Sequence, residues 1–296
     1  MTTSPDSPIL ERGMTFPGGK AGAGVYQTII NLMPPHQVYI EPFLGGGAIM
    51  RLKRPAALNI GVDLDPAVVE GWRNNLVATP KVPMVARIDG PGDGGSALGG
   101  SGERRRRRSP EPAILDVADP IVEAGDVRSH FRFLQGDGIA FLRAYAFACK
   151  ELVYCDPPYL MSTRSGRRLY RFEMTPVHHR HLLRVLQDLP CRVMISGYWS
   201  PLYAETLKDW QSVTFQAMTR GRHPATEWLW FNFEPPVALH DYQYLGRTFR
   251  ERERIHRKQR RWCARLAHMP LLERQALLSA VRAAGIIDDG GDGVLH

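Results

Sequence analysis

The tetrapeptide Asp156-Pro157-Pro158-Tyr159 contains the residue types in this chain that are best suited to chemistry. It directly follows the apolar run 152–155, so it begins where a buried strand would end. Two successive prolines keep the backbone extended and hold the Asp156 carboxylate and the Pro157 carbonyl in a fixed relation. Two acceptors placed in this way can receive both hydrogens of one amino group, and the Tyr159 ring can stack on a flat group. By itself, the tetrapeptide also occurs in unrelated turns.

Such a pair of acceptors would activate an aromatic amine as a nucleophile. The lone pair of such an amine is delocalised into its ring, so the amine reacts slowly by itself. Hydrogen bonds to two acceptors favour the pyramidal, nucleophilic form and stabilise the positive charge that develops during attack on a methyl group. The tetrapeptide therefore predicts chemistry on an amine.

A second segment, residues 41–48, reads Glu-Pro-Phe-Leu-Gly-Gly-Gly-Ala and lies between a predicted strand and a predicted helix. Its glycines permit a tight turn that a ligand can approach closely, which is where an open α/β sheet binds a cofactor. Two other glycine patterns do not fit. A dinucleotide-binding pattern needs glycine or alanine where Met50 stands, and a P-loop ending at Lys20 needs glycine at Met14 and serine or threonine at Ala21.

Asp63 ends the next predicted strand, about twenty residues further along, which is the spacing of a ribose-binding carboxylate. Its two oxygens could accept hydrogen bonds from both ribose hydroxyls. The alternative is helix capping, because Asp65-Pro66 is a typical helix start and Asp63 could share that role. We favour ribose binding for Asp63 and capping for Asp65.

Short β-rich runs alternate with helical patterns through most of the chain, which is typical of an α/β domain with a largely parallel sheet. Thr175 is expected to cap one helix, with Pro176 at the first helical position. The predicted strands are 37–40, 59–63, 131–135, 152–155, 192–196, 212–217 and 227–233, and the predicted helices include 67–77, 139–148 and 176–187.

Two regions interrupt this alternation. Within a domain that spans residues 1–245, residues 90–112 are rich in glycine, serine and arginine and are expected to form a disordered insertion. Residues 246–296 are expected to form a basic helical extension whose second helix begins at Pro270 and ends near Gly285.

The first helix of that extension has two kinds of repeat. Ile255, Trp262, Leu266 and Met269 recur at helical spacing, which predicts a stripe that packs against the rest of the chain. The arginines between them either form a solvated face or contact phosphates. The formal charge of the whole chain is +8, which favours association with polyanions.

Three segments, in this order, resemble the signature motifs of the Dam-type adenine-specific DNA methyltransferases: Phe-Pro-Gly-Gly-Lys at 16–20, Glu-Pro-Phe-Leu-Gly-Gly-Gly at 41–47 and Asp-Pro-Pro-Tyr at 156–159. The resemblance covers residues 14–78 and 130–235. It implies a Rossmann-like S-adenosylmethionine-dependent methyltransferase fold of the α/β class, with a seven-stranded, mostly parallel sheet, helices on both faces and an antiparallel final hairpin. It also implies methyl transfer to the exocyclic 6-amino group of adenine in double-stranded DNA, with the base flipped out of the duplex.

The resemblance assigns roles to individual residues. Lys20 and Glu41 would hold the methionine end of S-adenosylmethionine, Asp63 would hold its ribose, and Asp137 would lie near its adenine. The catalytic residues would be Asp156, Pro157, Pro158 and Tyr159. The full set of expected cofactor contacts is Phe16, Gly18, Gly19, Lys20, Glu41, Phe43, Gly45, Gly47, Asp63 and Asp137.

The sequence departs from the family at residues 90–112, where a typical Dam-type enzyme carries a folded target-recognition segment. Two groups of basic residues are candidates to contact DNA in its place. These are Arg164, Arg167 and Arg168, just after the catalytic turn, and Arg257, Lys258 and Arg261 on the basic helix. Two alternatives stay open: the same chemistry on structured RNA, and a catalytically inert nucleic-acid-binding protein. The target sequence and any restriction endonuclease partner are also open.

Other classes of site are not expected. Direct methyl transfer needs neither a metal nor a cysteine nucleophile, and the four cysteines form no C-x-x-C pair. His178, His179 and His181 lie on a predicted helix without matching carboxylates or thiols, so we expect surface or capping roles for them. No apolar run is long enough to cross a bilayer, and the N-terminus does not resemble a signal peptide, so a cytoplasmic protein without membrane contact is expected.

Overall fold

The computed structural model describes residues 20–22, 24–78, 130–164, 170–218 and 223–285. The strands are β1 (Val38–Glu41), β2 (Leu58–Asp63), β3 (Phe131–Gln135), β4 (Glu151–Cys155), β5 (Arg192–Gly197), β6 (Gln211–Met218) and β7 (Pro224–Phe231). The helices are α1 (Val25–Ile30), α2 (Ala48–Leu52), α3 (Pro66–Ala78), α4 (Gly138–Ala144), the 3₁₀ helix η2 (Met161–Thr163), α5 (Pro176–Asp188), α6 (Pro201–Thr206), α7 (Phe249–His268) and α8 (Leu271–Ala283). Phe16, Gly18, Gly19, Arg167, Arg168 and the predicted insertion at 90–112 lie outside the described residues.

The seven strands form one sheet in the order β3-β2-β1-β4-β5-β7-β6. β2 pairs in parallel with β1 and with β3, and β1 pairs in parallel with β4. β7 is antiparallel to both β5 and β6, so the chain finishes the sheet with a reversed hairpin. This strand order confirms the predicted Rossmann-like methyltransferase fold.

The chain divides into two compact units, which are described separately. The β1–β4 unit comprises the described parts of Gln37–Gly46 and Pro55–Val193. The hairpin unit comprises the described parts of Met1–His36, Gly47–Arg54 and Met194–His296, and so contains β6, β7, α7 and α8.

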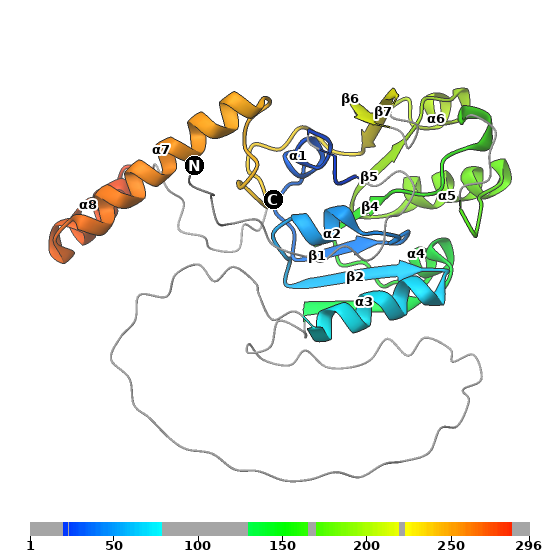
Figure 1. The fold of residues 1–296 in the computed structure, drawn as a ribbon, viewed down its shortest axis with the longest axis horizontal. Helices are drawn as coiled ribbons and strands as arrows, with labels where there is room; N and C mark the ends of the chain where they lie inside the picture. The colour runs from blue at the N-terminus through cyan, green and yellow to red at the C-terminus, as the bar shows by residue number, and fades with distance from the viewer. Residues whose placement is uncertain (1–19, 23, 79–129, 165–169, 219–222, 286–296) are drawn as a thin grey trace, which may run out of the picture. The chain divides into compact units, whose positions relative to one another are not determined.

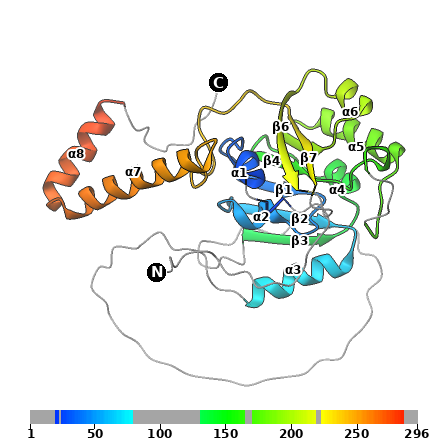
Figure 2. The ribbon, with the colours of Figure 1, turned by 45° about the horizontal axis from the view of Figure 1, so that its top comes forward.

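The core of the β1–β4 unit is built on its central strands. All five residues of β4 are buried, as expected for a parallel strand that is covered on both faces. α3 runs alongside β2 and β3 in both views (Figure 1, Figure 2). α5 contributes an apolar stripe at positions 182, 183 and 186, where each leucine is fully buried. Thr175 caps α5 as predicted, because its side chain accepts a hydrogen bond from the His178 N–H.

In the hairpin unit, the segment after β7 is tied back to the first two helices. The His240 N–H donates to the Met33 carbonyl, and Asp241 accepts from the Arg54 N–H at 2.8 Å. The Tyr244 hydroxyl donates to the Leu52 carbonyl at 3.1 Å. These bonds fix the point from which α7 begins.

α7 runs as one continuous helix in both views (Figure 1, Figure 2). It has 20 residues, none of which is buried. The predicted packing stripe is therefore wrong: Trp262 is 48% exposed, and Ile255, Leu266 and Met269 are only half-buried. Periodicity had correctly indicated a helix with an apolar side, but no other part of the described chain covers that side. α8 follows Pro270, and Gly285 ends it in a left-handed conformation with φ of 64°, as predicted.

Two predicted boundaries were wrong. The helix expected at 139–148 ends at Ala144, because Tyr145 leaves the helical conformation and its ring packs on Phe141 and Phe147. The strand expected at 227–233 instead covers Pro224–Phe231, because β7 pairs with β6 along its whole length, from Pro224 opposite Met218 to Phe231 opposite Gln211.

Candidate active site

Four acidic side chains lie at the carboxyl ends of four neighbouring parallel strands in the β1–β4 unit. Glu41 ends β1 and Asp63 ends β2, while Asp137 follows β3 and Asp156 follows β4. Because these strands are parallel, the four residues share one edge of the sheet in the spatial order Asp137, Asp63, Glu41, Asp156. Neighbouring strands are about 4.8 Å apart, so the row extends over roughly 14 Å. Open α/β sheets bind their ligands at this edge.

Glu41 is a buried carboxylate held by its own strand. The Tyr39 hydroxyl donates a hydrogen bond to Glu41 Oε1 at 2.6 Å. Burial, and then the negative charge of Glu41, raise the pKa of Tyr39 well above its usual value, so the hydroxyl keeps its proton and remains a donor. The Tyr39 hydroxyl thereby helps to fix the Glu41 carboxylate in place.

Asp63 joins the end of β2 to the glycine-rich turn. One of its oxygens accepts a hydrogen bond from the Gly45 N–H at 2.7 Å, and the other accepts from the Asp65 N–H at 2.8 Å. Burial raises the pKa of Asp63, although these backbone donors act in the opposite direction. Each carboxylate oxygen can accept a second hydrogen bond, so bracing the turn is compatible with binding a ribose. Asp65 caps α3 as predicted, accepting from the Ala67 N–H at 3.0 Å.

The turn after β1 is held from three sides within the β1–β4 unit. Besides Asp63, the Trp72 indole N–H donates to the Gly45 carbonyl at 3.0 Å. Gly45 has φ of 43°, a left-handed conformation that favours glycine. The start of α4 presses against the same turn, because a Cβ at Gly138 would lie 2.0 Å from the Pro42 carbonyl oxygen. The turn is therefore rigid before any ligand binds.

Asp137 has a structural role in addition to its place at the sheet edge. Its side chain caps α4 by accepting a hydrogen bond from the Ala140 N–H at 2.8 Å, and the residue is exposed. Phe43 is half-buried in the turn, whereas Gly47 begins α2 in the hairpin unit with φ of 50°. The predicted cofactor contacts of these residues remain predictions.

The tetrapeptide 156–159 leaves the sheet at the end of β4, as predicted. Asp156 and Pro158 are half-buried, whereas Pro157 is buried and Tyr159 is only 7% exposed. Just before the turn, burial raises the pKa of Cys155 well above its usual value, so this thiol is not a nucleophile at neutral pH.

His179 corrects the expectation that the three histidines of α5 are surface or capping residues. His178 fits that expectation, because its ring accepts from the Thr175 N–H at 3.3 Å, and His181 is exposed. His179, however, is fully buried and hydrogen-bonds to the backbone of Pro158, inside the tetrapeptide. Burial lowers the pKa of His179 to about 4, so its ring is neutral at neutral pH. A signal for its burial was present in the sequence, because His179 shares a helical face with Leu182, Leu183 and Leu186.

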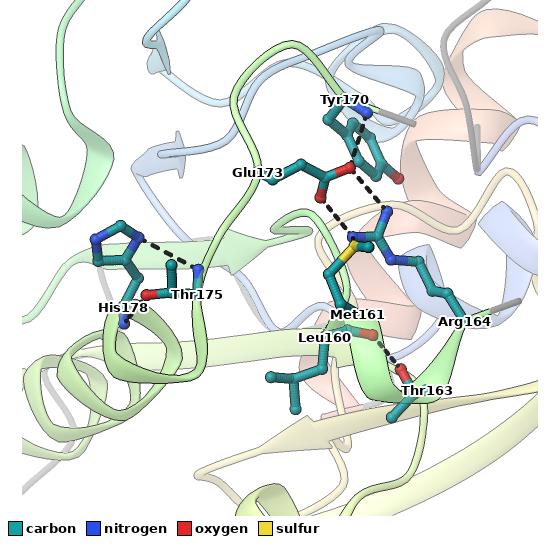
Figure 3. Close-up of polar contacts among 8 residues, drawn as sticks. All are labelled: Leu160, Met161, Thr163, Arg164, Tyr170, Glu173, Thr175 and His178. Carbon is teal, nitrogen blue, oxygen red and sulfur yellow. Dashed lines mark hydrogen bonds and ion pairs between the residues drawn. The ribbon is translucent and has the colours of Figure 1, made fainter. Parts of the chain in front are cut away.

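Arg164 also differs from its predicted role. Figure 3 shows its guanidinium directed at the Glu173 carboxylate, with which it forms a salt bridge, while the Arg164 side chain is only 5% exposed. The same carboxylate accepts from the Tyr170 N–H at 3.1 Å, and the guanidinium lies over the Tyr170 ring. Contrary to the prediction of a DNA contact, Arg164 is enclosed within the β1–β4 unit.

Lys20 is the one residue of the first motif that the structure describes. Its ammonium group lies 3.3 Å from Glu227 Oε2 on β7, and both side chains are almost fully buried. A buried charge pair of this kind is stable only while both partners are present. The pairing gives Lys20 a structural role within the hairpin unit, and its predicted contact with a cofactor remains a prediction.

The basic helix α7 carries the remaining predicted residues. Arg254, Arg257, Lys258 and Arg261 line an open hollow of about 500 Å³. Their spacing of i, i+3, i+4 and i+7 places them on one face, with no acidic residue among them. Arg257, Lys258 and Arg261 are all exposed.

In the described part of the chain, no three side chains of His, Cys, Asp or Glu gather as a metal site would require. None of the described helices combines the length and the apolar character needed to cross a bilayer.

Comparisons with known proteins found similar solved structures but no similar sequence among family models or curated proteins. Among solved structures, a putative methyltransferase from Streptococcus mutans in complex with SAH is 11% identical, with a TM-score of 0.39 over 69% of this chain and 94% of that one. An rRNA methylase from Streptococcus thermophilus is 9% identical, with a TM-score of 0.39 over 70% and 93%. A precorrin 8W decarboxylase from Methanobacterium thermoautotrophicum is 10% identical, with a TM-score of 0.38 over 73% and 93%. These similarities concern the chain trace and do not extend to side chains or substrates.

Proposed function

We propose that this protein is an S-adenosylmethionine-dependent methyltransferase that transfers a methyl group to the exocyclic amine of adenine in duplex DNA. The observation that carries the proposal is the row of carboxylates at the carboxyl edge of β3, β2, β1 and β4, which ends at the tetrapeptide 156–159. The choice of adenine and DNA rests on the resemblance of the three motifs to the Dam type.

The residues at this edge fit the proposed cofactor. A rigid turn with left-handed Gly45 lets a ligand approach the backbone, and Asp63 has acceptor capacity left for ribose hydroxyls. Glu41, on the next strand toward Asp156, supplies a buried carboxylate for the amino group of the methionine end. When bound, S-adenosylmethionine supplies an electrophilic methyl group on a sulfonium sulfur.

The chain's own part in the reaction lies at the tetrapeptide. The Asp156 carboxylate and the Pro157 carbonyl would accept the two hydrogens of the amine and so favour its nucleophilic form. While the nitrogen gained the methyl group and the sulfur left as a neutral thioether, the Asp156 carboxylate would stabilise the positive charge on nitrogen. Asp156 would then take up the proton that the methylated amine loses.

The cationic face of α7 favours a nucleic acid as the substrate. Arg254, Arg257, Lys258 and Arg261 line one hollow on an exposed helix. Glu251 lies 4.0 Å from Arg254 but does not line the hollow, so the row of cations there is suited to backbone phosphates. Arg164 is excluded from this set because Glu173 already binds its guanidinium. We assign phosphate contact to the α7 face alone among the described residues.

One assay tests the proposal. Tritiated methyl transfer from S-adenosylmethionine is measured on unmethylated duplex DNA and on total RNA, with Asp156→Ala as the blank. Label on the N6 position of adenine in DNA is the expected result. Label in RNA alone would replace DNA by RNA as the substrate, and the absence of label from both would favour an inert nucleic-acid-binding protein.

A further inference from the structure

The catalytic tetrapeptide rests on a buried polar cluster that none of the motifs contains. The imidazole of His179 hydrogen-bonds to the backbone of Pro158. Since Pro158 has no N–H, the group that it offers is its carbonyl, and the neutral imidazole must donate. α5, which packs through three fully buried leucines, is thus joined to the tetrapeptide 156–159 by one specific hydrogen bond.

A second part of the cluster is the ion pair between Arg164 and Glu173, close to the first. It joins the residue after η2 to the segment that leads into α5 (Figure 3). Arg164 is near enough to His179 for its positive charge to disfavour protonation of the ring. Glu173 also accepts a hydrogen bond from the Tyr170 N–H. One carboxylate is therefore bonded both to the residue after η2 and to the segment that leads into α5.

We propose that His179 and the Arg164–Glu173 pair are positioning residues, which act through the Pro158 carbonyl to hold Asp156 and the Pro157 carbonyl in the geometry that the amine requires. The inference rests on the proposed function, since it assigns the cluster a part in that reaction.

The cluster is suited to this task because its parts depend on one another. A proline pair fixes its own φ angles, but the ψ angles of Pro157 and Pro158 still let the peptide planes of the turn rotate, and the Pro157 carbonyl with them. A hydrogen bond to the Pro158 carbonyl removes that freedom. The bond needs an imidazole N–H directed at the carbonyl, while burial and the nearby Arg164 guanidinium oppose a second proton on the ring. Glu173 in turn balances the charge of Arg164, which would otherwise be buried alone.

The test compares three variants of the full chain. His179→Leu fills the buried site and removes the donor, His179→Gln retains an N–H donor, and His181→Gln is the matched control on the exposed side of the same helix. For each variant we measure kcat on duplex DNA, the S-adenosylmethionine Kd by calorimetry, and hydrogen exchange of the backbone amides in 159–164.

His179→Leu is expected to lower kcat by about a hundredfold, the loss that follows from a small misplacement of reacting groups. Its cofactor Kd should stay within about twofold of wild type, because the cofactor residues lie on other strands. His179→Gln should restore most of the lost kcat, and His181→Gln should behave as wild type. Full activity in His179→Leu, or a loss of kcat matched by an equal loss of cofactor affinity, would overturn the proposal.

A second pair of variants tests the ion pair. Glu173→Gln leaves Arg164 buried without its counterion and should lower kcat as His179→Leu does. Arg171→Gln, which removes the exposed pair between Arg171 and Asp65, should leave kcat unchanged because exposed pairs contribute little. Equal effects of the two variants, or no effect of Glu173→Gln, would count against the role assigned to Glu173.

Hydrogen exchange separates this inference from the proposed function. If wild-type protein methylates neither DNA nor RNA, the proposed function fails, yet faster exchange at 159–164 in His179→Leu would still show that His179 holds the turn. Unchanged exchange there, in a variant that keeps the wild-type Tm, would overturn the positioning role whatever the activity. If His179→Leu does not fold, hydrogen exchange at 159–164 is compared between Glu173→Gln and Arg171→Gln instead. Faster exchange in Glu173→Gln alone would support the positioning role, and equal exchange in the two variants would overturn it.

Discussion

The Asp63 carboxylate accepts a hydrogen bond from the Gly45 N–H at 2.7 Å, and this bond connects the end of β2 to the glycine-rich turn after β1. A residue that the sequence suggests for ribose binding therefore also shapes the turn beside the ribose. The two roles are not alternatives, because the same carboxylate can do both.

Asp63→Ala should therefore impair two properties at once. We expect a loss of about 1 to 3 kcal/mol of stability, because two backbone N–H groups lose their acceptor, and a weaker S-adenosylmethionine affinity by calorimetry. Asp65→Ala is the matched control: it removes a helix cap worth about 1 kcal/mol and should leave the affinity unchanged. Unchanged cofactor affinity in Asp63→Ala would remove Asp63 from the cofactor site.

Asp156→Ala should affect turnover and spare the cofactor. Asp156 acts on the amine, so its loss should reduce kcat by at least about a hundredfold, the scale of one lost electrostatic contact in a transition state. Single-turnover methylation with cofactor binding measured in parallel checks both halves of this prediction. A variant that methylates DNA at nearly the wild-type rate would contradict the mechanism.

The cationic face of α7 should be visible in the salt dependence of DNA binding. Replacing Arg257, Lys258 and Arg261 by glutamine should weaken binding to all duplex sequences alike and reduce the slope of log K against log salt by about 0.9 per lost phosphate contact. Arg260→Gln, on the same helix but outside the hollow, is the control and should change the slope less. An unchanged slope in the triple variant would place the DNA elsewhere.

His179 should make the free energy of unfolding depend on pH in a defined range. Burial lowers the folded-state pKa of His179 to about 4, whereas the unfolded chain has a value near 6.5. Between these values the unfolded state binds more protons, so this contribution to stability is complete above the unfolded pKa and is lost as the pH falls toward 4. The loss between about pH 8 and about pH 5 should be about 2 kcal/mol.

Denaturant titrations of wild type and His179→Gln at a series of pH values measure this contribution directly. The difference between the two proteins in unfolding free energy should shrink as the pH falls, because glutamine does not titrate. Parallel curves over that range would show that the His179 ring titrates with its ordinary pKa in the folded protein.

The sequence predicted the sheet well because its strands are apolar runs that end at turn residues. The predicted bounds of β3 match the structure to the residue. The predicted bounds of β1, β2, β4 and β5 lie within one residue of the observed bounds at either end. Helix ends were harder to place. α4 stops at Ala144 because Tyr145 finds aromatic neighbours outside the helix, a tertiary effect that local pattern does not encode.

The candidate site was predicted in part for a similar reason. Glu41, Asp63 and Asp156 each follow an apolar strand, so their common edge could be deduced from parallel topology. The enclosure of Arg164 depends on its pairing with Glu173 across a loop, and no spacing rule indicates it. The exposed apolar side of α7 shows the same limit, because periodicity identifies a face but not the surface that covers it.

Gly138 and Gly61 differ in kind from the residues of the reaction. A Cβ at Gly138 would overlap the Pro42 carbonyl, and one at Gly61 would lie 2.7 Å from a Leu44 methyl group. The contact at Gly138 is with backbone, so any side chain there would force α4 away from the turn, whereas at Gly61 the Leu44 and Phe133 side chains would have to shift. A descendant of this chain that lost Asp156 would still need glycine at position 138 to keep the turn packed against α4. In a lineage of such proteins, Gly138 would therefore record the shared architecture, whereas the acidic residue after β4 would record whether the chemistry was kept.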